Sequence, residues 1–153
     1  MTEVLSNGTL RAVCDGSYQP DLTTTGVAAA FIIESNDRKH QIKGGCCIDS
    51  SDANPYLAEL LGIYLILTAI HLIEQENPEL SNSQLHIGCD NEQAGYRSIE
   101  DDTKVPVKYN HFDLLKAIRQ MRSKLRTDTK SYHIYMDIKT NMFPTYTYLR
   151  KLN

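Results

Sequence analysis

The sequence predicts an α/β fold with a mixed five-stranded sheet, in which three antiparallel strands come first and two parallel strands then arrive by crossovers. Three observations favour this fold. Short apolar runs alternate with turn residues in the first third, a long helical pattern occupies the middle, and a strand, further helices and a last strand follow. At 153 residues the chain has the length of one domain, which we expect to cover residues 1–153.

Three strands are predicted before the first helix. Residues 9–15 (TLRAVCD) form the first, and we expect the pair Gly16 and Ser17 to end it with a turn. Residues 27–34 (VAAAFIIE) and 41–48 form the second and third, joined by a polar segment that is typical of a hairpin connection. Together these runs predict an antiparallel meander.

Helices and the two remaining strands are predicted in the rest of the chain. Apolar residues recur every three or four positions over 55–75, which indicates a long helix. A fourth strand is expected over 84–90, followed by a short helix over 91–99. The segment 111–125 is strongly amphipathic and predicts another helix, and the alternating, aromatic and β-branched run 132–138 predicts the fifth strand.

Composition and charge exclude several classes of protein. With 41% hydrophobic and 23% charged residues, the chain is neither a disordered tail nor a membrane protein, and we expect no membrane partner. The first ten residues lack a basic region followed by an apolar run, so we expect an intracellular location, in the cytoplasm or nucleus. The four cysteines fit neither a zinc-binding CxxC pair nor a disulfide framework, which predicts free thiols.

Positive charge is concentrated in residues 104–130, which hold eight lysines and arginines and two acidic residues. Residues 1–103 hold five basic and sixteen acidic residues. A basic helix of this kind either contacts a polyanion such as nucleic acid or forms a solvated face, and the charge pattern leaves both open. The candidate contact residues on this helix are Lys116, Arg119, Arg122 and Lys124.

Two aspartates, Asp15 and Asp90, stand at the ends of predicted strands. Right-handed crossovers place the fourth strand beside the first, so both carboxylates are expected at the same sheet edge, and Glu59, early in the long helix, adds a third. Clustered carboxylates repel one another unless a divalent cation relieves the repulsion. Oxygen ligands favour Mg²⁺ or Mn²⁺, and two such ions promote phosphodiester hydrolysis. A lone aspartate before glycine is usually a turn residue, but the three acids together favour a metal site.

Three motifs resemble those of ribonuclease H. They are VCDGS at 13–17, LAEL at 57–60 and IGCDN at 87–91, which look like the DGS, AEL and DS/DN motifs of that family. The likeness covers about residues 9–138 and is greatest to the ribonuclease H domains of retroelement reverse transcriptases, whose helix before the last strand the segment 111–119 resembles.

The resemblance implies an endonuclease that cleaves the RNA strand of RNA–DNA hybrids with two Mg²⁺ ions, for which Mn²⁺ substitutes. It carries over Asp15, Glu59 and Asp90 as catalytic residues and metal ligands, and we expect Ser17 and Asn91 to contact nucleic acid. It also implies a partner, the reverse transcriptase part of the same polyprotein. The RNA–DNA hybrid is the expected substrate.

The end of the sequence differs from the family pattern. There the last strand leads into a loop with a functional histidine and then a helix that supplies a fourth carboxylate. No Asp, Glu or His follows Asp137, and Asp137 itself falls within the predicted last strand, too early to match. We therefore expect an irregular tail that lacks the usual acid-bearing helix, and weakened catalysis.

Two other functions are compatible with these motifs. One is a catalytically silent module that binds hybrids or acts as a scaffold, although a scaffold gains nothing from clustered acids. The other is a different nuclease of the same superfold, integrase-like or resolvase-like. The position of Glu59 in the first long helix disfavours the latter, because integrase-type cores place their helix carboxylate after the later strands.

Overall fold

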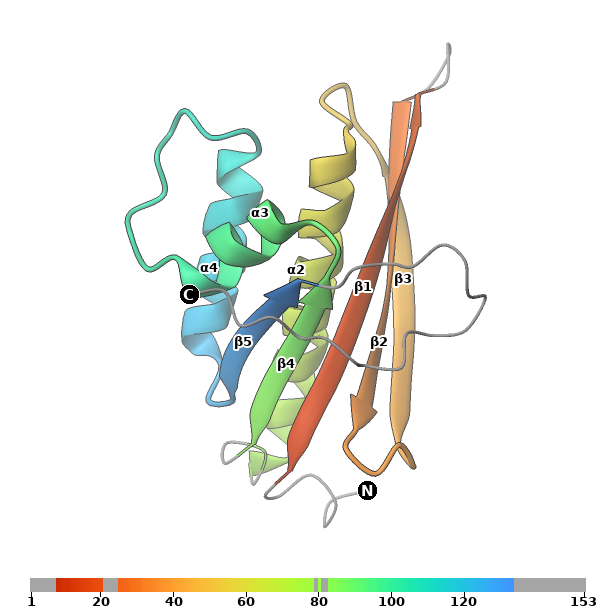
Figure 1. Ribbon diagram of the computed structural model, residues 1–153, viewed down its shortest axis with the longest axis vertical. Helices are drawn as coiled ribbons and strands as arrows, with labels where there is room; N and C mark the ends of the chain where they lie inside the picture. The colour runs from red at the N-terminus through yellow and green to blue at the C-terminus, as the bar shows by residue number, and fades with distance from the viewer. Residues whose placement is uncertain (1–7, 21–24, 79, 81–82, 134–153) are drawn as a thin grey trace.

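The computed structural model describes residues 8–20, 25–78, 80 and 83–133. Its strands form one five-stranded sheet in the order β3-β2-β1-β4-β5, seen in Figure 1. The pairs β1–β2 and β2–β3 are antiparallel, and β1–β4 and β4–β5 are parallel. The predicted fold class, an antiparallel meander followed by two parallel strands with helices packed on the sheet, is therefore confirmed.

The meander consists of β1 (Thr9–Pro20), β2 (Thr25–Ser35) and β3 (Gln41–Asp49). The prediction that β1 ends in a turn at Gly16 is wrong, because β1 continues to Pro20 and pairs with β2 from Leu10 to Pro20. Its pairing with β4 (Gln84–Cys89) is shorter and ends at Val13 and Gly88. Asp15 therefore lies within β1 and not, as the sequence predicted, at its end, but it does lie beyond the last β1–β4 pair.

The long helix α2 (Pro55–Glu76) confirms the helix predicted over 55–75. Asn54 caps its start, because the Asn54 side chain accepts a hydrogen bond from the Leu57 amide at 2.8 Å. The same side chain contacts His111 Nε2 at 2.8 Å through its amide nitrogen. Because an amide nitrogen donates, His111 accepts through a neutral ring, and this bond ties the start of α2 to the start of α4 (Phe112–Lys124).

Helix α2 supplies most of the core. It packs against β1 and β2 on one side and against α4 on the other, as Figure 1 shows. Among the described residues it is the one helix long and apolar enough to span a membrane, but 56% of that stretch is buried inside the protein. Its fully buried side chains include Leu60, Ile63, Ile66, Leu67 and Ile70. The apolar length of α2 is thus used to cover the sheet.

The predicted short helix over 91–99 is confirmed as α3 (Glu92–Gly95) followed directly by the π-helical turn η2 (Tyr96–Glu100). The predicted helix over 111–125 is α4. Helix α3 contacts β4 and β5, and η2 contacts both α4 and β5. The segment α3–η2 therefore packs against the two parallel strands, whereas α4 packs against α2.

The last strand, β5 (Asp128–His133), begins four residues before the predicted start of the fifth strand. It pairs with β4 from the very first residue, Gln84 with Asp128. The prediction missed this start because the sequence Asp-Thr-Lys-Ser has no apolar alternation, and Thr129 and Ser131 point inward as small polar residues. The remainder of the predicted strand, residues 134–138, and the predicted irregular tail lie outside the described residues.

Candidate metal centre

Asp15 is exposed and follows Cys14, whose side chain is buried against α2. Two glycines let α2 approach β1 closely at this point. A Cβ on Gly16 would lie 2.8 Å from the Ala58 Cβ, and a Cβ on Gly62 would lie 2.7 Å from the Cys14 Cβ. Gly16 therefore serves helix packing within a strand and does not form the predicted turn.

Glu59 lies in the second turn of α2 and is 5% exposed. Its Oε1 accepts a hydrogen bond from the Gly16 amide at 2.9 Å, and its Oε2 accepts one from the Cys89 thiol at 3.3 Å. Each carboxylate oxygen is thus oriented by a different strand. Within the described ranges, no lysine or arginine forms an ion pair with Glu59.

Asp90 directly follows β4 and is exposed. The next residue, Asn91, caps α3, since its side chain accepts a hydrogen bond from the Ala94 amide at 2.9 Å. This cap fixes the chain direction immediately after Asp90. The predicted contact between Asn91 and nucleic acid stays a prediction, beside this observed structural role.

Oxygens of Asp15, Glu59 and Asp90 all lie within 4.8 Å of one another. The structure thus brings together the three acids that the sequence singled out. Burial, followed by the negative charge of Asp90, raises the pKa of Glu59 to about 7. The hydrogen bonds from Cys89 and Gly16 oppose this rise. Without a cation, both burial and the charge of Asp90 therefore oppose ionisation of Glu59.

The donor set fits a hard divalent cation. All three side chains offer oxygen, the donor that Mg²⁺ and Mn²⁺ prefer. The two aspartates are exposed and the glutamate between them is buried, so an ion has access from solvent on the aspartate side. A cation at this position would offset the repulsion that raises the pKa of Glu59.

Two buried thiols lie on the helix side of the same carboxylate. Cys14 and Cys89 are 4% and 1% exposed, which agrees with the thiols expected from the sequence. Their sulfur atoms and an oxygen of Glu59 also lie within 4.8 Å of one another. The neighbouring Cys89 thiol, together with burial, raises the pKa of Cys14 well above its usual range. Each cysteine directly precedes one of the two clustered aspartates, and this shared spacing is the sequence feature that could have indicated the second group.

The basic helix α4 is partly committed to contacts within the chain. Arg119 donates to the carbonyl oxygens of Arg97 (2.7 Å) and Thr103, and it pairs with Asp101 at 3.2 Å. Its side chain is only 12% exposed. These bonds fasten the segment after η2 to α4, an intramolecular role that the charge pattern did not indicate.

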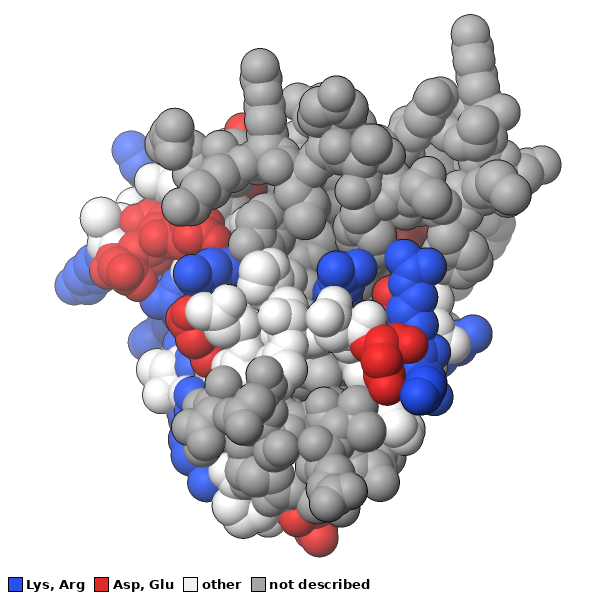
Figure 2. All heavy atoms as spheres, turned by 60° about the horizontal axis from the view of Figure 1, so that its bottom comes forward, with Lys and Arg blue, Asp and Glu red and all other residues white. Residues whose placement is uncertain are grey.

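Arg122 makes similar contacts, donating to the Ile99 carbonyl oxygen and to Asp102. In contrast, Lys116 and Lys124 are exposed, as is Ser17 on β1. Among the described residues in the view of Figure 2, lysine and arginine side chains lie in separate groups, several of them beside acidic ones. Nucleic-acid contact by these predicted residues stays a prediction, and the two lysines are the freer candidates of the four on α4.

A fourth carboxylate does not join the three within the described part of the chain, where the oxygen-ligand group consists of Asp15, Glu59 and Asp90. Asp137, which the sequence analysis did not match to the fourth acid, lies outside the described residues. Glu100, the acid at the end of η2, is engaged elsewhere, because it accepts a hydrogen bond from the Ser131 amide at 2.7 Å. The expectation that the site lacks a fourth carboxylate therefore stays a prediction.

Comparison with known proteins gives matches in structure and none in sequence. The sequence matches no protein-family model and no curated protein. RNase H1 from the halophilic archaeon Halobacterium salinarum is similar in structure, with a TM-score of 0.59, 19% identity and coverage of 83% of this chain and 86% of that one. LC11-RNase H1 in complex with an RNA/DNA hybrid gives a TM-score of 0.58 at 12% identity, covering 82% of this chain and 84% of that one.

A viral structure shares the same architecture. The foamy viral protease-reverse transcriptase in complex with dsDNA gives a TM-score of 0.58 at 17% identity, covering 92% of this chain and 89% of that chain. These likenesses extend over nearly all of the described elements. The order of the strands, their directions and the helices packed on them are those of the ribonuclease H fold, and the chain has that fold.

Proposed function

We propose that this protein is a metal-dependent endoribonuclease that cleaves the RNA strand of RNA–DNA hybrids. The observation that carries the proposal is the convergence of a buried Glu59 with two exposed aspartates at the end of the β1–β4 pairing. A ribonuclease H fold with this acid cluster supports a hybrid nuclease or a related module. The similar LC11-RNase H1 structure contains an RNA/DNA hybrid, which supports the same substrate class.

The residues of the chain have separable roles in this proposal. The Gly16 amide and the Cys89 thiol orient the two oxygens of Glu59, and Asp15 and Asp90 present carboxylates to solvent. The chemistry supplied by a bound pair of Mg²⁺ ions is activation of a water and stabilisation of the leaving oxygen. The three acids would hold these ions, and Mn²⁺ would substitute for Mg²⁺.

The similarity to a foamy viral protease-reverse transcriptase supports a place in a retroelement polyprotein, beside a reverse transcriptase. A second function, a silent hybrid-binding module, is favoured by one observation: among the described residues the oxygen-ligand group holds three acids. With these three acids alone the second ion would be held weakly, and cleavage would be slow. The two functions differ in whether bound hybrid is cut.

Cleavage of a labelled hybrid in Mg²⁺ and in Mn²⁺ tests the proposal. The wild-type protein should cut only the RNA strand, and Asp15→Asn or Asp90→Asn should reduce the rate by more than about 100-fold, because even outer-shell partners of a metal contribute 10–100-fold. Asp49→Asn, which changes an exposed aspartate on β3, is the matched control and should leave the rate unchanged. Binding of hybrid without cleavage in either metal would favour the silent module, and cutting of double-stranded DNA would contradict the proposed specificity.

The salt dependence of hybrid binding tests the role of α4. Each lysine or arginine that contacts a phosphate releases condensed counterion, so Lys116→Gln and Lys124→Gln should each flatten the slope of log affinity against log salt by up to about 0.9. Titrations at several salt concentrations measure the slope. Arg119→Gln should instead lower the thermal stability, because it removes bonds to Arg97 and Asp101. Unchanged slopes in both lysine variants would show that this face of α4 is only solvated.

A further inference from the structure

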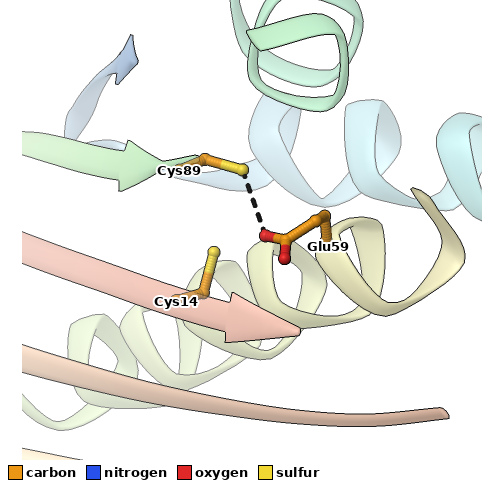
Figure 3. A group of neighbouring side chains, drawn as sticks. All are labelled: Cys14, Glu59 and Cys89. Atoms are coloured by element: carbon orange, nitrogen blue, oxygen red, sulfur yellow. Dashed lines mark hydrogen bonds between the residues drawn. The ribbon is translucent and has the colours of Figure 1, made fainter. Parts of the chain in front are cut away.

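Cys14 and Cys89 form a dithiol beneath the acid cluster. They occupy adjacent positions on the neighbouring parallel strands β1 and β4, just beyond the last pair, Val13 with Gly88. Figure 3 shows both sulfur atoms and the Glu59 carboxylate directed toward one another, with the Cys89 thiol hydrogen-bonded to Glu59. Two soft sulfur donors, from Cys14 and Cys89, and one hard oxygen donor, from Glu59, thus face a common point inside the protein.

The spacing of these donors suits a tetrahedral metal ion. Zn²⁺ binds sulfur at about 2.3 Å and carboxylate oxygen at about 2.0–2.2 Å, so its ligand atoms stand roughly 3.5–3.8 Å apart. The two sulfurs and the Glu59 oxygen already lie within 4.8 Å of one another. Binding a Zn²⁺ ion therefore requires these three ligand atoms to move closer together by about 1 Å or less.

We propose that Cys14, Cys89 and Glu59 form a second metal site, selective for thiophilic cations such as Zn²⁺ or Cd²⁺ and separate from the oxygen-only site. Mg²⁺ does not compete for this site, because thiolates are poor ligands for a hard ion. Glu59 belongs to both sites, and its Oε2 already faces Cys89. A thiophilic ion therefore takes the carboxylate away from Asp15 and Asp90 and inhibits the metal-dependent chemistry.

Protons leave as the ion binds. Each thiol releases one proton to solvent as its sulfur binds, so one divalent cation replaces two protons where the Glu59 carboxylate, the third ligand, is already ionised. Where Glu59 is protonated, it releases a third proton to solvent and the site takes up one net positive charge fewer. A water or a carboxylate oxygen completes the coordination. Entry is from the aspartate side, where Asp15 and Asp90 are exposed, whereas Cys14, Cys89 and Glu59 are all buried.

Co²⁺, used as a spectroscopic substitute for Zn²⁺, tests the site without any nucleic acid. The full chain should bind Co²⁺ with a thiolate-to-cobalt charge-transfer band, and added Zn²⁺ should remove the band. The Cys14→Ala/Cys89→Ala variant should lose the band, and the Cys46→Ser/Cys47→Ser variant should keep it. The second pair is the matched control, because these cysteines are also free but lie on β3 away from the cluster.

X-ray absorption at the zinc edge gives an answer even if the double alanine variant does not fold. Zinc-loaded Cys46→Ser/Cys47→Ser protein should show two sulfur ligands at about 2.3 Å. Absence of sulfur ligands, or a cobalt band that persists without Cys14 and Cys89, would overturn the proposed site. A band lost only in the β3 variant would place the metal on Cys46 and Cys47 instead, and would also overturn it.

Inhibition by zinc rests on the proposed function and is tested separately. In hybrid cleavage with Mg²⁺, the Cys14→Ala/Cys89→Ala variant should need at least about tenfold more Zn²⁺ for half-inhibition than the wild type, as expected when metal ligands are removed. Equal inhibition of both proteins would overturn the proposal that zinc inhibits by taking Glu59 away from the oxygen-only site. A thiolate band without any cleavage would contradict the proposed function alone, and cleavage without a band would contradict this metal site alone.

Discussion

Replacing Glu59 with glutamine should stabilise the metal-free protein at pH 8, by up to about 3 kcal/mol. The pKa of Glu59 is raised from its ordinary value of 4.5 to about 7, first by burial and then by the charge of Asp90. Ionising this group in the folded protein is therefore unfavourable. Glutamine is never ionised, and its carbonyl oxygen can still accept the hydrogen bond from the Gly16 amide.

The sign of the pH dependence follows from the raised pKa of Glu59. The folded state holds this proton more tightly than the unfolded state, so the wild-type protein loses stability as the pH rises from about 4.5 to about 7. The glutamine variant lacks this loss. The difference in unfolding free energy between the two proteins should be smallest near pH 4, grow across that interval and level off above pH 7.

Divalent cations should reverse the advantage of the glutamine variant. An ion that binds the folded state alone stabilises it by mass action, by about 2.7 kcal/mol at 100 times its dissociation constant. The wild-type protein should gain this stabilisation in Mg²⁺ or Mn²⁺, because Glu59 is available as a ligand. The variant should gain little, because it has lost the buried carboxylate between Asp15 and Asp90.

Urea denaturation with a chelator and with Mg²⁺, at pH values from 4 to 8, measures both effects. Glu76→Gln is the matched control, since Glu76 ends the same helix and is exposed. Its effect should stay within about 0.5 kcal/mol at every pH. A Glu59→Gln protein that is less stable than the wild type at pH 8 without metal would contradict the conclusion that burial and the charge of Asp90 disfavour the ionised form of Glu59.

The sequence was sufficient to predict the antiparallel meander, the fourth strand beside the first, and the convergence of the three acids. Asp15 and Asp90 each follow a short apolar run, and the handedness of crossovers leaves one way to place the fourth strand beside the first. Glu59 stands near the start of a long helical pattern that must cover the same sheet. Local pattern and topology were therefore enough to bring the acids together, although Asp15 lies within β1, where its pairing with β4 and not the strand itself ends.

The details of the site depend on contacts between distant residues, which local patterns do not contain. Gly16 looks like a turn residue next to Ser17, but it is required because Ala58 packs against it. The positive charge of Arg119 indicated a solvated or nucleic-acid-binding face, whereas its donors reach Arg97 and Asp101. Charge and composition show which kinds of side chain are present, but they do not show which residues those side chains contact.

The start of β5 was missed for a related reason. Strand prediction relies on apolar alternation, and the first four residues of β5 are polar. A buried acid on another element contacts the residues just before this strand. Glu74, near the end of α2, is 1% exposed, and it accepts hydrogen bonds from the backbone just before β5 begins.

Glu74→Ala is expected to destabilise the protein by about 3–5 kcal/mol, against a total stability of about 5–15 kcal/mol for a domain of this kind. The Glu74 carboxylate accepts from the Arg126 amide at 3.1 Å, the Thr127 amide at 2.8 Å and the Thr127 hydroxyl at 2.6 Å. Alanine leaves these donors without an acceptor, and Thr127 is itself buried. The Arg126 side chain also loses the carboxylate to which it is 4.0 Å away.

Glutamine and alanine at position 74 should differ, which separates hydrogen bonding from packing. Glutamine keeps the volume and one acceptor oxygen, so Glu74→Gln should lose less stability than Glu74→Ala, and Glu76→Ala on the exposed end of the helix should change it by no more than about 0.5 kcal/mol. Urea denaturation gives the three values, and amide hydrogen exchange at Arg126 and Thr127 reports the bonds directly. If Glu74→Ala lowers the free energy of unfolding by less than about 1 kcal/mol, water replaces the carboxylate and β5 is held by its pairing with β4. A large loss of stability together with faster amide exchange at Thr127 would instead establish that Glu74 on α2 determines where β5 begins.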